Sequence, residues 1–291
     1  MNNPIGVLAE IYPQLYLKPG EEGAAAYAEI VGRGKDAPEH SLDHFRGSPL
    51  DSLAAEMTPA GEVRIITLGD RQDFELFLRI MANRCTLAQI PATQGASILD
   101  GVVNWPRIRE HQKKFLESGG NPLDWPAEFR RFTAEPGNYK DALIVLSTGP
   151  YSAVTAEEAG MPEEAWLASS YQIRKAHECT HFICRRLYRE KINAVWDELV
   201  ADAVGLYAAF GRYDLKLAER FLGVSPDGYT GGRLINYAGE EDPDALARKA
   251  HRTLLHLEHV IRGEGKTDPY QLAIRLEKEI GVWTGSGQEQ A

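Results

Sequence analysis

Two pairs of polar side chains constrain the fold more than any other feature of this chain. His177 and His181 stand four residues apart in the stretch RKAHECTHFICRRL, and Glu198 and Asp202 stand four apart in NAVWDELVADAVGLY. In an α-helix, residues four apart lie on the same face, about one turn from each other. Each pair therefore predicts a helix that carries two polar side chains on one face.

The spacing between the two pairs predicts that their helices run antiparallel. The apolar pattern stops in LYREKIN, so we expect the chain to reverse near residues 190–192. At about 1.5 Å per residue, about nine residues lead from His181 to this turn and about seven lead back to Glu198. Glu198 then lies within about one helical turn of the height of His181, and Asp202 lies near His177.

The remaining patterns predict an α+β, helix-rich chain. Residues 62–68 (EVRIITL) and 142–147 (ALIVLS) have the apolar patterns of strands, and residues 71–83 have helical spacing. From Pro162 onward, helical periodicity dominates, and it predicts helices at 162–189, 193–210, 214–222, 243–262 and 269–280.

We therefore predict one unit of two lobes. Residues 1–160 form a mixed α/β front lobe, residues 161–283 form a mainly helical back lobe, and the polar residues 284–291 form a disordered tail. The helix with the two histidines lies close to the junction of the lobes.

Composition excludes several classes of partner. The net charge of −10 argues against nucleic acid, because phosphate neutralisation needs clustered Lys and Arg. No apolar stretch is long enough to span a membrane, and the N-terminal residues do not resemble a signal peptide. The three cysteines form no C-x-x-C pair, which is typical of reduced thiols in a cytoplasmic protein.

The stretch His177-Glu178-Cys179-Thr180-His181 fits the pattern H-E-x-x-H. Both imidazoles can reach a single Zn²⁺ ion, and a catalytic zinc site needs three protein ligands plus an open position. Glu178 flanks that position, where it can take a proton from water. Glu198 can supply the third ligand, with Asp197 as a competitor, and Asp202 can hold the second ring nitrogen of His177. We therefore expect one zinc ion per chain.

The sequence HECTH followed by ELVAD resembles the H-E-x-x-H … E-x-x-x-D pattern of gluzincin metallopeptidases, the group that includes thermolysin-like enzymes. The resemblance covers residues 177–202. It implies that His177, His181 and Glu198 bind zinc, that Glu178 is the general base and that Asp202 orients a ligand. It also implies a zincin-like fold, in which an edge strand pairs with extended substrate.

Two further groups of residues are candidates for contact with substrate. The stretch ALIVLSTGPYSAV (142–154) predicts either the substrate-binding edge strand or a plain core strand. Side chains that could stabilise the transition state or hold substrate are Tyr151, Tyr171, His251, His259 and Arg233. For each of these five, a packed or solvent-facing side chain is the alternative.

These observations favour a zinc-dependent hydrolase, and among hydrolases a metallopeptidase that acts on a peptide or protein substrate. Two alternatives remain open. Glu178-x-x-His181 also fits the carboxylate–histidine motif of di-iron helix bundles. The chain could also be a non-catalytic or inactive zincin-like protein that binds a metal ion. The sequence predicts neither the cleavage specificity nor the oligomeric state.

Overall fold

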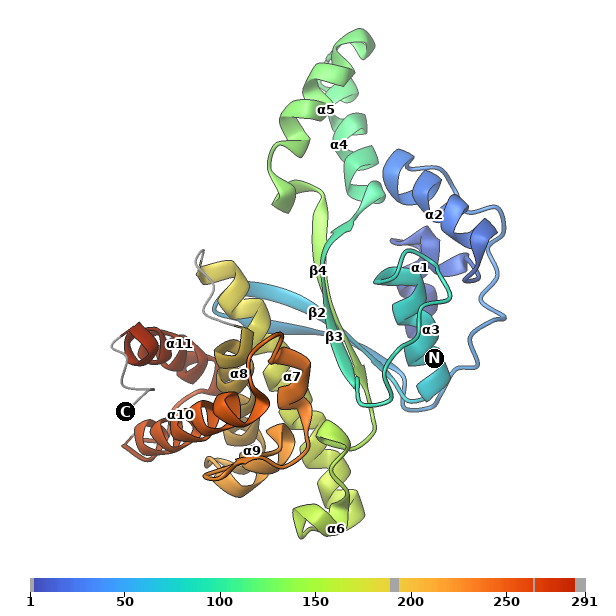
Figure 1. Ribbon diagram of the computed structural model, residues 1–291. Helices are drawn as coiled ribbons and strands as arrows, with labels where there is room; N and C mark the ends of the chain where they lie inside the picture. The colour runs from blue at the N-terminus through green and yellow to red at the C-terminus, as the bar shows by residue number, and fades with distance from the viewer. Residues whose placement is uncertain (1–2, 189–193, 264, 286–291) are drawn as a thin grey trace. The chain divides into compact units, whose positions relative to one another are not determined.

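The computed structural model describes residues 3–188, 194–263 and 265–285, and it has the α+β composition that the sequence predicts (Figure 1). The chain divides into two compact units. The first contains Met1–Ala55, Val63–Ala92 and Ile98–Ser147. The second contains the short segments Glu56–Glu62 and Thr93–Ser97 together with Thr148–Ala291. The main division along the chain therefore follows Ser147.

The larger sheet has four strands in the order β1-β2-β4-β3. The strands are β1 (Ser52–Thr58), β2 (Gly61–Leu68), β3 (Ala96–Val103) and β4 (Lys140–Ser147). Strands β2 and β4 are parallel, with Ile66 opposite Val145. The helices of the first unit are α1 (Pro4–Ala9), α2 (Glu21–Arg33), α3 (Arg71–Met81), α4 (Trp105–Glu117) and α5 (Trp125–Thr133), with short 3-10 turns at Pro13–Tyr16, Pro122–Asp124 and Pro136–Asn138.

Of the two alternatives for residues 142–154, a substrate-binding edge strand or a core strand, the core strand is confirmed and the edge strand is wrong. Strand β4 lies between β2 and β3, so the edges of the sheet are β1 and β3. Residues 143–146 are completely buried. A continuous apolar run of this kind is typical of a strand that is covered on both faces, whereas an edge strand usually carries polar interruptions.

The second unit is mainly helical. Its helices are α6 (Ala156–Ala159), α7 (Glu163–Leu187), α8 (Ala194–Phe210), α9 (Leu215–Leu222), α10 (Pro243–Gly263) and α11 (Pro269–Gly285). A small β5–β6 hairpin (Val224–Ser225 with Gly228–Tyr229) and two 3-10 turns, η4 (Tyr151–Ala153) and η5 (Arg233–Tyr237), complete it. All five helices predicted after Pro162 are present. The predicted chain reversal and residues 286–291 of the predicted tail lie outside the described residues.

Helices α7 and α8 form the most extensive helix pair among the described elements. Their close approach has a local cause at Gly205, where an added Cβ atom would lie 2.8 Å from the carbonyl oxygen of Ile173. Apolar side chains surround this contact, and Ile173, Val200 and Val204 are completely buried. Because the backbones pack this closely, polar side chains on the facing surfaces can meet.

None of the described helices combines the length and the apolar character that crossing a bilayer requires.

Candidate metal centre

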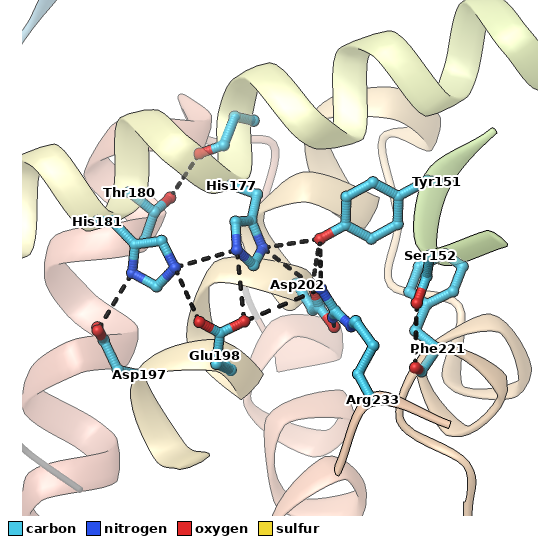
Figure 2. Close-up of polar contacts among 11 residues, drawn as sticks. Tyr151, Ser152, His177, Thr180, His181, Asp197, Glu198, Asp202, Phe221 and Arg233 are labelled. Atoms are coloured by element: carbon cyan, nitrogen blue, oxygen red, sulfur yellow. Dashed lines mark hydrogen bonds and ion pairs between the residues drawn. The ribbon is translucent and has the colours of Figure 1, made fainter. Parts of the chain in front are cut away.

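Helices α7 and α8 bring His177, His181 and Glu198 together (Figure 2). The Nε2 atoms of the two histidines are 3.0 Å apart. One Glu198 carboxylate oxygen lies 3.5 Å from Nε2 of His177, and the other lies 3.3 Å from Nε2 of His181. The two imidazoles are buried, with exposed fractions of 5% and 4%. Three potential metal ligands therefore converge on one point between the helices.

A carboxylate holds the other nitrogen of each imidazole. Nδ1 of His177 lies 2.9 Å from Asp202 Oδ1, the pairing that the spacing predicts. Nδ1 of His181 lies 3.1 Å from Asp197 Oδ2. Asp197, considered above as a competing ligand, thus contacts the nitrogen of His181 that points away from the cluster. Carboxylates in these positions fix the orientation and the tautomer of metal-binding histidines in known sites.

This arrangement requires a positive charge between the histidines. An ionised carboxylate only accepts hydrogen bonds, so each Nδ1 carries the proton and each neutral ring has a lone pair on Nε2. Two such lone pairs at 3.0 Å, with the Glu198 carboxylate beside them, repel one another unless a cation or a proton lies between them. A metal ion or a proton on one imidazole satisfies this requirement.

In the metal-free chain, His181 takes that proton. Burial by itself lowers the pKa of His181, but the hydrogen bonds and charges of Asp197 and Glu198 raise it to about 10. Burial opposes ionisation of Glu198, but the hydrogen bond from His181 and the charges of His177, His181 and Arg233 hold its pKa well below the usual range. The imidazolium of His181 can then donate from Nε2 to Nε2 of His177.

We expect the His181 imidazole of the metal-free protein to lose its proton near pH 10 rather than near the ordinary value of about 6.5. Because the folded-state pKa is the higher one, this proton stabilises the fold fully below about pH 6.5, and the stabilisation is lost as the pH rises towards 10. Nitrogen NMR of the imidazole measures the titration. Asp197→Asn should lower the pKa of His181, and a wild-type His181 that titrates near pH 6.5 would contradict the account.

The donor set fits a zinc ion. Zn–N and Zn–O distances of about 2.0–2.2 Å in a tetrahedron place neighbouring ligand atoms about 3.3–3.6 Å apart. The two Nε2 atoms are 3.0 Å apart, and each has a different Glu198 carboxylate oxygen near it, at 3.5 Å from His177 and 3.3 Å from His181. Two imidazoles and one carboxylate also form the ligand set of one common class of catalytic zinc sites, which leaves a fourth position open.

Tyr151 and Arg233 lie on the Nδ1 side of His177 (Figure 2). The Tyr151 hydroxyl donates to Asp202 Oδ1 at 2.7 Å and is 2.9 Å from Nδ1 of His177. Arg233 donates to the Tyr151 hydroxyl at 3.2 Å and forms a short ion pair with Asp202. Burial opposes ionisation of Asp202, yet Arg233 and the His177 hydrogen bond hold its pKa below the usual value. These two residues, predicted as substrate contacts, therefore hold Asp202 in place.

The backbone after Tyr151 is held in an unusual conformation. Ser152 and Ala153 have φ values of 54° and 58°, in the left-handed region that non-glycine residues rarely adopt. Each such residue typically costs about 1–3 kcal/mol and persists where surrounding contacts enforce it. Ser152 Oγ donates to the Phe221 carbonyl at 3.1 Å, and the Tyr151 amide donates to Ser170 Oγ at 3.0 Å. This turn fixes the Tyr151 ring against His177.

Glu178 is on α7 directly after His177, and its exposed fraction is 8%. No hydrogen bond joins its carboxylate to another residue in the described part of the chain, whereas the neighbouring carboxylates of Asp197 and Asp202 are each occupied by a histidine. The Glu178 carboxylate is thus free to accept a hydrogen bond from water.

Two of the remaining predicted substrate contacts, His251 and His259, make no contact with the histidine pair in the described part of the chain. His251 is buried and its Nε2 atom lies 3.0 Å from Glu219 Oε1. His259 is exposed on α10, so the two do not share a buried face. Tyr171 is half-buried on α7, and the hydrogen bonds that hold the two imidazoles come from other side chains.

Residues 8–261 match the model of a family described as "Family of unknown function (DUF7005)". The chain belongs to this family. The matched region includes all five residues of the histidine–carboxylate cluster, His177, His181, Asp197, Glu198 and Asp202. No curated protein and no solved structure shows significant similarity to the chain.

Proposed function

We propose that the chain is a zinc-dependent hydrolase that cleaves peptide bonds, with His177, His181 and Glu198 as the zinc ligands. One observation carries the proposal. One donor atom from each of His177, His181 and Glu198 lies within 4.8 Å of the other two, and a carboxylate holds the Nδ1 atom of each imidazole. A helix that carried two histidines for packing alone would need neither the third donor nor the two supporting carboxylates.

The chemistry follows from the roles of the neighbouring groups. A bound zinc ion would polarise the scissile carbonyl and lower the pKa of water at the open position towards about 7. Glu178 takes the proton from that water as it attacks, and later passes the proton to the departing amine. Asp202 and Asp197 keep both imidazoles in the tautomer that presents Nε2.

A peptide substrate is favoured by the order of the motifs along the chain. H-E-x-x-H on α7 followed by E-x-x-x-D on α8 is the pattern of gluzincin peptidases, and the two helices bring both motifs to one point. Together these features support a zincin-like interpretation of the second unit. The phenol of Tyr237 on η5 is a further group near the cluster. Burial and the Glu198 carboxylate raise its pKa, so it stays protonated and can donate a hydrogen bond.

The proposal is tested by incubating the zinc-loaded protein with a diverse peptide library and following new termini by mass spectrometry. Cleavage should stop when a chelator removes zinc and should return when zinc is added back. Full cleavage by the chelated, metal-free protein, or no cleavage of any peptide by the zinc-loaded protein, would contradict the proposed activity.

A further inference from the structure

A second group of potential metal ligands lies next to the first. Cys184 on α7, Asp197 on α8 and Glu277 on α11 each offer one ligand atom, and these atoms all lie within 4.8 Å of one another. All three helices pack against one another within the second unit. From the sequence, Asp197 was considered only as a competing ligand of the histidine site, and neither Cys184 nor Glu277, which is 80 positions from Asp197, was predicted as a ligand.

Glu277 has the burial and the free acceptor expected of a metal ligand. Its exposed fraction is 6%, and its Oε2 atom is completely buried without a hydrogen-bond partner. A buried carboxylate oxygen without a partner is costly, because it has lost its hydration and gained nothing in return. Burial and the nearby Asp197 carboxylate raise the pKa of Glu277, although the Cys184 hydrogen bond and the His181 charge oppose this rise.

The donors define the kind of ion that fits. Cys184 is buried, with an exposed fraction of 5%, and a thiolate favours borderline or soft ions over Mg²⁺ or Ca²⁺. Two carboxylates and one thiolate carry three negative charges, so the site with a divalent ion bound has a net charge of −1. Asp197 has an exposed side-chain fraction of 29%, which gives an ion a route from solvent.

We propose that Cys184, Asp197 and Glu277 form a second binding site for a divalent ion of the zinc class, separate from the histidine site. Asp197 belongs to both sites, because its Oδ2 atom lies 3.1 Å from Nδ1 of His181. An ion bound to Asp197 withdraws electron density from the carboxylate that orients His181. Occupation of the second site therefore weakens the hydrogen bond between Asp197 and His181 in the histidine site.

Cobalt substitution tests this proposal directly, because cobalt bound to a thiolate has a near-ultraviolet charge-transfer band that cobalt bound by histidine and carboxylate lacks. The metal-free full-length protein is titrated with Co²⁺ while absorbance and bound metal are measured. We expect about two Co²⁺ ions per chain and the thiolate band, because one ion would bind at each cluster.

Cys184→Ser should abolish the band and one equivalent of cobalt, and Glu277→Gln should weaken the band-forming ion at least about tenfold. Cys179→Ser is the matched control, since Cys179 is another buried cysteine on α7 outside the cluster. His177→Ala should lose the ion of the histidine site and keep the thiolate band. Loss of one site can therefore be distinguished from loss of the other. A wild-type protein without the band, or a band that persists in folded Cys184→Ser, would overturn the proposal.

Discussion

The Glu178→Gln variant is expected to keep the zinc content of the wild-type protein and to hydrolyse peptides about 10²–10⁴-fold more slowly. The amide has the shape of the carboxylate but cannot take a proton from the attacking water. Because the hydrogen bonds that hold the two imidazoles come from Asp197, Asp202 and Tyr151, the substitution should leave the ligands in place.

The comparison requires three measurements on the same preparations: zinc per chain, circular dichroism, and the rate on the best peptide from the library. Glu164→Gln is the matched control, because Glu164 is an exposed carboxylate in the first turn of the same helix. It should retain both zinc and rate. A Glu178→Gln protein that cleaves as fast as the wild type would exclude Glu178 as the general base.

The Asp202→Asn variant is expected to lower the free energy of unfolding of the metal-free protein by about 3–5 kcal/mol. Asp202 is completely buried and is the partner of three groups, namely Nδ1 of His177, the Tyr151 hydroxyl and the Arg233 guanidinium. The neutral amide removes the nearest counter-charge of the largely buried Arg233 guanidinium, which keeps, among the described residues, only the Glu198 carboxylate at 3.9 Å. A buried charge that loses its partner costs far more than an exposed one.

Urea unfolding followed by circular dichroism measures this loss. Glu241→Gln provides the contrast, because its ion pair with Lys249 is 2.6 Å long but about one third exposed. We expect it to change stability by less than about 1 kcal/mol. Adding Arg233→Met to Asp202→Asn should restore part of the lost stability. An Asp202→Asn protein as stable as the wild type would show that the network contributes little to the fold.

The sequence predicts the paired helices and their register because both depend on local periodicity. His177 and His181, and likewise Glu198 and Asp202, share a helix face by spacing alone. Their meeting across the helix pair follows from a short connection and a fixed rise per residue. The helices after Pro162 can be predicted from the sequence in the same way, since each has an apolar stripe with a period near 3.6 residues.

The surroundings of the histidines depend on contacts that are distant in the sequence. Arg233 reaches Asp202 from a 3-10 turn, and Glu277 comes from the last helix. Tyr151 is placed by a left-handed turn at Ser152 and Ala153, and neither residue type signals that conformation. Helical spacing could have predicted that Asp197 contacts Nδ1 of His181. Asp197 lies about one turn from Asp202 on α8, and His181 lies about one turn from His177 on α7, so the second pair meets as the first does.

The position of β4 in the sheet could not be predicted from the sequence pattern, because it too depends on contacts that are distant in the sequence. A short apolar run is compatible with an edge strand or a central strand until its neighbours are known. The neighbours here are β2, which precedes it by more than 70 residues, and β3, which is separated from it by α4 and α5. The complete burial of residues 143–146 in the folded chain distinguishes the central strand from the edge strand.

The central claim is that His177, His181 and Glu198 bind a zinc ion, and metal content measured by plasma mass spectrometry tests it most directly. The protein is purified without chelators and without a metal-affinity step, beside His181→Ala and the control His251→Ala, a buried histidine paired with Glu219. The account predicts bound zinc in the wild type and the control, and one zinc ion fewer per chain in His181→Ala. A wild-type protein without metal, or a His181→Ala protein with unchanged zinc, would contradict it.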